Sequence, residues 1–182
     1  MLPTRRREIN AIAERIRDFL QLGTYSSPVD LDSCVHRLGG EIIRSANLTE
    51  AMIAKRGDSF RITINRNLHP NRERFSIAHE IGHLFLHMGY CIDDAKWNAI
   101  DEFRDDPMFR CGYSEEEREA NEFAGAFLMP RDAFLVEFGK NETDDNKVDL
   151  KPIAEHFEVS VEAALRRGQW LGVVAWWEQA IR

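Results

Sequence analysis

The spacing of apolar residues along the chain predicts mostly helices. Apolar residues recur every three or four positions in residues 5–21, which is the pattern of an amphipathic helix. A short helix capped by Asp30 or Asp32 should follow and end at a pair of glycines, and a central apolar helix should end at Gly89. Further helices are predicted at residues 115–128 and 130–138.

Strand patterns occur before the central helix. Residues 59–65 alternate apolar with polar side chains, which indicates a strand with one buried face. Residues 51–55 precede them across a short Arg-Gly-Asp turn, so the two runs should form a hairpin. With a short strand at residues 41–44, these segments predict a small antiparallel sheet. The expected fold class is therefore α+β, with a mainly helical core.

The last part of the chain predicts a pair of helices. Residues 150–171 read as two helices joined by a Glu-Val-Ser segment, with Ser160 as N-cap of the second helix. The pair has helix-turn-helix-like proportions, which makes DNA binding one hypothesis, but it carries only three basic residues among its glutamates. A pair packed on the core is the favoured interpretation. We expect a single domain over residues 1–182, with 148–182 as a C-terminal helical subregion; residues 173–182 fit a strand or a helix.

The candidate chemistry lies in the central helix, in the sequence His79-Glu80-Ile-Gly-His83. Residues four positions apart lie on one face of a helix, about 6 Å apart along its axis, so both imidazoles can reach one metal ion. Glu80 is then placed to act as general base toward a water at the metal. The alternative is a helix of the core in which both histidines have hydrogen-bond partners and no metal. This helix is apolar almost all round, however, and burying polar groups without partners is costly. His87 lies about 12 Å along the axis from His79, too far to bind the same ion, and should have a supporting or structural role.

Composition and charge limit the classes of function that fit the chain. The chain has 182 residues, 43% hydrophobic and 30% charged, as in a soluble globular protein. Its net charge of −7 argues against unaided binding to nucleic acid or to an anionic membrane, and the arginine run at residues 5–7 reads as a solvated face. No apolar run approaches a membrane span, and the start does not resemble a secretory signal. Three scattered cysteines fit a reducing compartment, so we expect a cytoplasmic protein.

Two motifs in a fixed order resemble the ImmA/IrrE family of metallo-endopeptidases. They are Phe75-Ser-Ile-Ala-His-Glu-Ile-Gly-His-Leu-Phe-Leu-His87 and Glu117-Arg-Glu-Ala-Asn-Glu-Phe-Ala-Gly-Ala-Phe-Leu-Met-Pro130. The resemblance covers about residues 28–171, which is most of the chain.

This resemblance implies a fold, a cofactor and a kind of partner. It implies a zincin-like core in which His79, His83 and Glu117 hold a zinc ion and Glu80 is the catalytic base. Proteins of this family typically cleave a helix-turn-helix transcriptional repressor, so we expect a zinc-dependent endopeptidase whose protein substrate is such a DNA-binding regulator. Some are paired with such regulators in toxin–antitoxin-like modules. A component that binds its partner with little or no proteolysis is therefore the alternative.

The predicted helix face supports Glu117 among its acidic neighbours. At about 100° per residue, Glu117 shares a face with Ala120, Asn121 and Ala124, whereas Glu119 points well away. The alanines let this helix approach the central helix closely, and Asn121 is placed to hydrogen-bond a metal ligand. The alternative is that Glu117 belongs to a solvated acidic run that opens the helix, where the helix dipole favours carboxylates.

The sequence leaves two roles open. The acidic stretch at residues 91–116 reads as a loop, and it fits a lid over the cleft and an insertion without a catalytic part equally well. Peptide hydrolysis also needs a donor for the developing oxyanion. The candidate donors are Tyr90, Tyr113, His69, Arg72 and Arg74.

Overall fold

A computed structural model describes residues 1–23, 28–49, 51–100, 114–142 and 148–175, and shows the mainly helical α+β fold that the sequence predicts. In chain order the elements are α1 (Pro3–Phe19), α2 (Leu31–Arg37), β1 (Glu41–Ser45), β2 (Met52–Arg56), β3 (Ser59–Asn65), α3 (Pro70–Leu86), α4 (Asp94–Asn98), α5 (Glu115–Leu128), α6 (Arg131–Lys140), α7 (Leu150–Phe157) and α8 (Val161–Leu171). In the part of the chain that the structure describes, each helix is too short or too polar to span a lipid bilayer.

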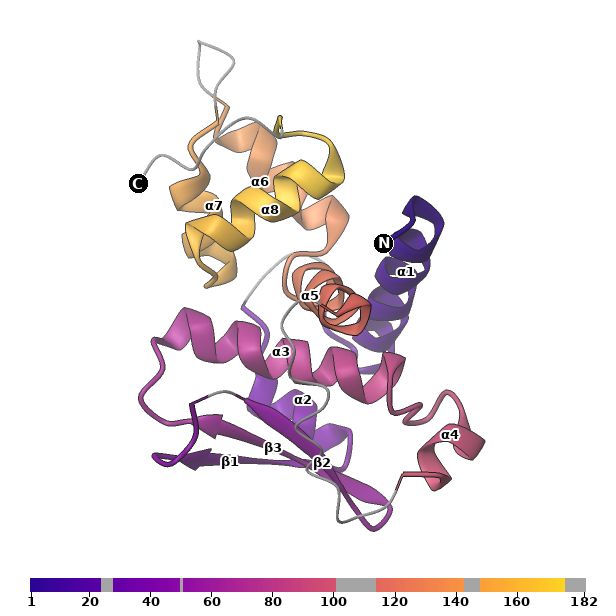
Figure 1. Cartoon of the computed structure of the whole chain (residues 1–182). Helices are drawn as coiled ribbons and strands as arrows, with labels where there is room; N and C mark the ends of the chain where they lie inside the picture. The colour runs from indigo at the N-terminus through magenta and orange to yellow at the C-terminus, as the bar shows by residue number, and fades with distance from the viewer. Residues whose placement is uncertain (24–27, 50, 101–113, 143–147, 176–182) are drawn as a thin grey trace.

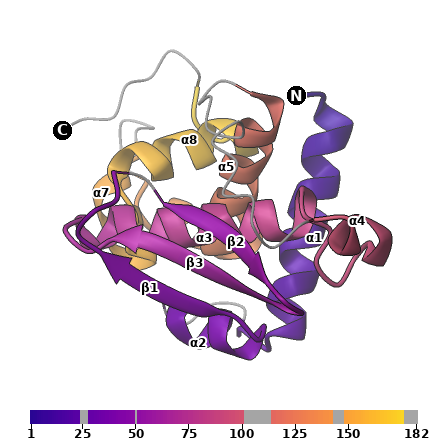
Figure 2. The same ribbon diagram turned by 60° about the horizontal axis from the view of Figure 1, so that its bottom comes forward.

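The elements form layers around α3. The sheet packs on one side of α3, and α5 packs on the other side (Figures 1 and 2). Helix α1 lies along α5, while α7 and α8 pack together on the side of α3 away from the sheet (Figure 1). Covering α3 on both sides buries its apolar residues and fixes the His79-Glu80 motif between two layers.

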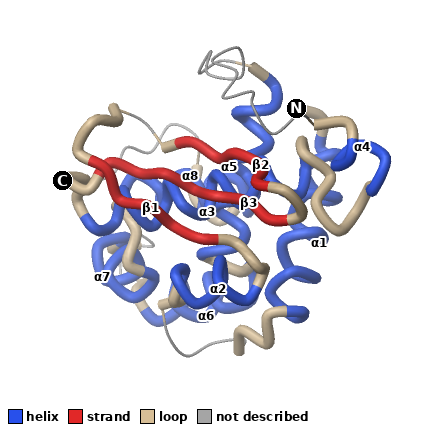
Figure 3. Tube along the Cα trace, turned by 90° about the horizontal axis from the view of Figure 1, so that it is seen from below, coloured by secondary structure: helices blue, strands red, loops and turns tan. Residues whose placement is uncertain are grey.

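The sheet has the strand order β1–β3–β2 (Figure 3). Strands β2 and β3 form the predicted antiparallel hairpin, with Ile53 opposite Ile62, and Phe60, Ile62 and Ile64 are fully buried. Strand β1 pairs parallel with β3, with Ile42 opposite Ile62, so the sheet is mixed and not wholly antiparallel as expected. The alternation of side chains specifies which face of a strand is buried but not the direction of the neighbouring strand, which explains the difference.

Most helix ends lie where the sequence places them. Asp30 caps α2, and Ser160 caps α8, each accepting a hydrogen bond from the backbone N–H three residues further on. Ser114 caps α5 in the same way. The chain turns away after α3 at Gly89, whose φ of +79° suits glycine. Helix α6 continues through its glycine to Lys140, beyond the predicted end, because glycine also tolerates helical geometry.

Part of the stretch expected to be a loop forms the short helix α4. It contains Trp97, which is buried and packs edge-on against Tyr90. Lys55 of β2 donates a hydrogen bond of 2.8 Å to the Trp97 carbonyl, so α4 is tied to the sheet. A helix of five residues is too short to show a clear period in the sequence. The choice between a lid and an insertion at residues 101–113 lies outside the described residues, as do residues 176–182 of the ambiguous C-terminal segment.

Small residues let α3 and α5 approach closely. A Cβ atom placed on Gly82 would lie 3.1 Å from the Ala120 Cα and 3.2 Å from the Phe123 Cβ, which is tighter than ordinary contact. Ala120 and Ala124 are completely buried on the facing side of α5. The expectation of a close approach is confirmed at Ala120, and the approach brings the start of α5 over the middle of α3.

Candidate metal centre

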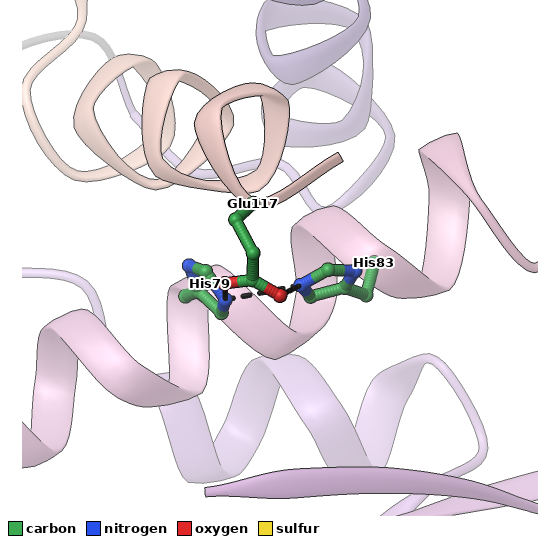
Figure 4. Close-up of side chains that lie close together, drawn as sticks. All are labelled: His79, His83 and Glu117. Carbon is green, nitrogen blue, oxygen red and sulfur yellow. Dashed lines mark hydrogen bonds and ion pairs between the residues drawn. The ribbon is translucent and has the colours of Figure 1, made fainter. Parts of the chain in front are cut away.

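Three predicted ligand side chains meet between α3 and α5. His79 and His83 project from successive turns of α3, and Glu117 reaches them from the first turn of α5 (Figure 4). Each Glu117 oxygen lies 3.2 Å from Nε2 of one histidine, and the two Nε2 atoms are 3.0 Å apart. The structure therefore brings together the three residues that the sequence proposes as ligands.

These separations fit one small metal ion. In a tetrahedral zinc site the ligand atoms lie about 2.0–2.1 Å from the metal, and hence roughly 3.3 Å from one another. The donor atoms of His79, His83 and Glu117 need only a slight outward shift to reach that spacing. Three protein ligands leave one tetrahedral position open for water or substrate. Among the described residues, no second group of His, Cys, Asp and Glu side chains gathers in this way.

A hydrogen bond with Asn121 fixes the orientation of His79. Nδ1 of His79 lies 3.1 Å from Oδ1 of Asn121. An amide oxygen can only accept, so Nδ1 of His79 carries a proton and donates it, which turns Nε2 toward Glu117 and His83. Asn121 lies one turn after Glu117 on α5, as the helix-face argument requires.

A chain of side chains supports His83 from the opposite direction. Its Nδ1 lies 2.9 Å from Nδ1 of His87, and Nε2 of His87 lies 3.4 Å from Glu119. Glu119 in turn accepts hydrogen bonds of 2.7 and 2.8 Å from Arg5 of α1. Because a carboxylate only accepts, His87 donates from Nε2 to Glu119, and His83 donates from Nδ1 to His87. This arrangement keeps Nε2 of His83 facing the other two ligands.

Local charges set the protonation of the three side chains. Burial lowers the pKa of His83 to about 3, with help from the charges of His79 and His87, so this ring is neutral near pH 7. Burial also lowers the pKa of His79, but its hydrogen bond to Glu117 and the charges of Glu80 and Glu117 outweigh burial and raise that pKa overall. The hydrogen bond from His79 lowers the pKa of Glu117. A metal ion must displace a proton from His79, so we expect metal affinity to fall as the pH falls.

Glu80 follows His79 on α3 and is almost completely buried. Its charge contributes to the raised pKa of His79, the residue that precedes it. A buried carboxylate in this position can exchange a proton with a water in the open metal position, which is the work of a general base. Its role as the base remains a prediction.

The structure separates the candidate oxyanion donors. Tyr90 and Arg74 each donate to a backbone carbonyl elsewhere in the fold, at 2.6 and 2.9 Å. His69 and Arg72 line a cavity that also includes Asn121, the partner of His79. Tyr113 lies outside the described residues. The geometry therefore counts against Tyr90 and Arg74 and leaves His69 and Arg72 as candidates.

Two of the three arginines near the start of α1, Arg5 and Arg6, are not the solvated face that the sequence suggests, whereas Arg7 is exposed. Arg5 pairs with Glu119, and the Arg6 guanidinium lies 3.5 Å from the centre of the Trp170 ring and 3.4 Å from Glu122. Arg5 and Glu119 are separated by 114 positions in the sequence. No local spacing in the sequence indicates such a contact. The sequence therefore does not predict that α1 supports His83 through Glu119 and His87.

We expect His87→Ala to weaken zinc binding by about 10–100-fold, which is the usual effect of removing a residue that holds a metal ligand. The substitution removes the acceptor for His83 Nδ1–H, so the ring is free to turn its Nε2 away from Glu117. Competition with a chromophoric chelator measures the zinc affinity, and circular dichroism reports the fold. His36→Ala, at an exposed position on α2, is the control. Equal zinc affinity in the two variants would show that His83 is held by its helix alone.

Comparisons with known proteins place this geometry in a wider context. A family model described as the IrrE N-terminal-like domain, which is a peptidase family, matches residues 40–168. A solved structure of a Mycobacterium tuberculosis transcriptional regulator superposes with a TM-score of 0.57 at 21% sequence identity, over 88% of this chain and 46% of that chain. The chain therefore spans about half the length of that regulator, with which it shares the fold. The search of curated proteins gave no match.

Proposed function

Because the chain belongs to the peptidase family of IrrE N-terminal-like domains, we propose that it is a zinc-dependent endopeptidase that cleaves a protein substrate. The observation that carries the proposal is the meeting of His79, His83 and Glu117, whose donor atoms lie 3.0–3.2 Å apart beside Glu80. Two imidazoles and one carboxylate are a donor set used by catalytic zinc sites, which keep one position open.

Each residue has a defined task in this proposal. His79, His83 and Glu117 hold the ion. Zinc bound there would supply a Lewis acid for the peptide carbonyl and would make water acidic enough to attack near neutral pH. Glu80 takes the proton of the attacking water and delivers it to the leaving amine. Asn121 keeps the His79 ring in the orientation that this reaction needs.

The substrate that we propose is a helix-turn-helix transcriptional regulator. Cleavage of such a repressor is typical of the ImmA/IrrE family, which both motifs of this chain resemble. The structural neighbour is itself named a transcriptional regulator, which supports a regulatory setting for this fold. A DNA-binding substrate is met in the cytoplasm, and the free thiols of Cys34 and Cys91 fit that reducing compartment.

A cleavage assay with and without metal tests this function. The zinc-loaded protein is incubated with a helix-turn-helix regulator encoded next to its own gene, and the products are identified by mass spectrometry. We expect cleavage at one or a few sites, loss of cleavage when a chelator removes the metal, and recovery when zinc is added back.

Two outcomes would contradict the proposal in different ways. Cleavage that persists after complete removal of the metal would exclude a metal-dependent mechanism. A stable complex with an uncut regulator, formed by the zinc-loaded protein, would favour the alternative of a partner-binding component in a regulatory module.

A further inference from the structure

A cavity of about 1090 Å³ opens beside the metal centre. Its walls come from the start of α1 and of α3, one face of α5, and the pair α7 and α8. Asn121, which holds His79, is part of the wall, and Phe75, which also lines the cavity, lies one helical turn before His79 on α3. The cavity wall and the proposed metal ligands therefore lie on adjoining turns of α3 and α5.

One face of helix α8, the second helix of the helix-turn-helix-like pair, lines this cavity. Glu162, Arg166 and Trp170 follow one another at intervals of four residues on α8, and all three line the cavity. A recognition helix must protrude to enter the major groove. This face of α8 instead shares a cavity with residues of α3 and α5, so it is better placed to contact a peptide than a DNA duplex.

The charge of the cavity is opposite to that of the whole chain. Its lining contains six arginine and lysine residues but three glutamates, whereas the chain has a net charge of −7. Glu122 is shared by Arg6 and Arg167, and Glu162 pairs with Arg166. Two exposed basic residues of the lining, Arg72 on α3 and Lys151 on α7, have no ion pair among the residues that the structure describes. The third glutamate, Glu155, lies one turn after Lys151 on α7, and six basic residues against three glutamates leave the lining with a net positive charge.

Apolar side chains lie beside these cations. Phe75, Val159, Val161 and Ala163 contribute to the lining, and so does Trp170, whose ring is covered by the Arg6 guanidinium. Aromatic and aliphatic walls with a few polar groups are typical of binding pockets. The combination suits a large apolar side chain with a carboxylate close to it.

We propose that this cavity is the specificity site of the peptidase, and that it binds a substrate segment in which acidic residues flank a large apolar side chain. The inference rests on the proposed function, because it assigns the substrate class of the same centre. Arg72 and Lys151 bind the carboxylates of that segment, while Phe75 and Trp170 contact its apolar side chain. The helices α7 and α8 are thus a wall of the substrate site, not a DNA reader.

A binding experiment separates this inference from the question of catalysis. The probes are two fluorescently labelled octapeptides with a central phenylalanine, one flanked by glutamates and the other by lysines. Fluorescence anisotropy with the zinc-loaded protein gives both affinities, and mass spectrometry shows whether either peptide is cut. We expect the glutamate peptide to bind at least about tenfold more tightly, as charge complementarity at a partly enclosed site gives.

The decisive test reverses the charge of Arg72 and Lys151. The double substitution Arg72→Glu and Lys151→Glu should abolish or invert the preference, whereas Arg72→Gln with Lys151→Gln should remove it without inverting it. The control is Arg15→Glu with Arg66→Glu, which makes the same charge change at exposed positions that do not line the cavity. All four positions are exposed, and circular dichroism verifies the fold.

The possible failures are distinguishable. Equal affinity of the wild type for both peptides, or an unchanged preference after charge reversal in the cavity, would overturn the inference whether or not the chain hydrolyses peptides. Displacement of the glutamate peptide by a short DNA duplex at physiological salt would also overturn it, by showing that the basic residues serve nucleic acid. A clear preference without any cleavage would support the binding site and count against the proposed hydrolysis alone.

Discussion

Glu80→Gln is expected to lower the turnover of a cognate protein substrate by about 10²–10⁴-fold, the usual contribution of a general base. Glutamine keeps the size of the side chain but cannot take the proton of the attacking water. Since Glu80 is not one of the three side chains whose donor atoms meet, zinc content and fold should be preserved. Single-turnover cleavage, with zinc measured by elemental mass spectrometry on the same sample, gives both quantities.

The control for this variant is Glu73→Gln, on the same helix but in contact with Arg44 at the surface. It should retain the turnover of the wild type. Full activity of Glu80→Gln would refute the assignment of the base, while the metal ligands would still stand. Loss of zinc from Glu80→Gln would mean that the carboxylate helps to hold the ion.

The second large effect is expected for Glu117→Ala, which should reduce zinc affinity by about 10²–10⁴-fold. Zinc sites in small proteins bind with about 10–16 kcal/mol, and removing one of three protein ligands takes away roughly a quarter to a third of that. Glu119→Ala should retain zinc, because Glu119 contacts Arg5 and His87 and not the other proposed ligands. Isothermal titration of the metal-free variants measures both affinities.

These two glutamates form a matched pair on one helix. Glu117 has an oxygen 3.2 Å from each of the two histidines, while Glu119 lies behind them and is buried. A moderate loss of affinity in Glu119→Ala would fit its place in the chain that holds His83. Equal losses in the two variants, or a loss confined to Glu119→Ala, would show that the ligand has been placed on the wrong face of α5.

Local patterns in the sequence were enough to predict the part of the site that lies on α3. The interval between His79 and His83 equals about one helical turn, so their common face follows from helix geometry alone. The position of Glu117 needed the period of a second helix and the family resemblance, because its sequence neighbours are also acidic. Asn121 followed from the same period, and its contact with His79 is present in the structure.

Features that depend on contacts between distant segments could not be predicted in this way. The parallel pairing of β1 with β3 depends on how the chain crosses the sheet, which side-chain alternation does not record. The pairing of Arg5 with Glu119 joins residues 114 positions apart, which no local pattern records. A run of arginines at the start of a helix instead suggests a solvent-exposed face. The cavity arises only when α8 is placed opposite α3 and α5.

We expect the close packing of α3 on α5 at Gly82 and Ala120 to restrict which ions the centre accepts. A Cβ atom placed on Gly82 would lie 3.1 Å from the Ala120 Cα, so the spacing of the two helices there is set by the backbone and not by side-chain rotamers. Calcium prefers six to eight oxygen ligands at about 2.3–2.6 Å, and magnesium keeps an octahedral oxygen shell. Two imidazoles and one carboxylate held about 3 Å apart offer neither arrangement. We therefore expect the donor set and its spacing to disfavour the abundant hard cations of the cell, without requiring exceptional affinity for zinc.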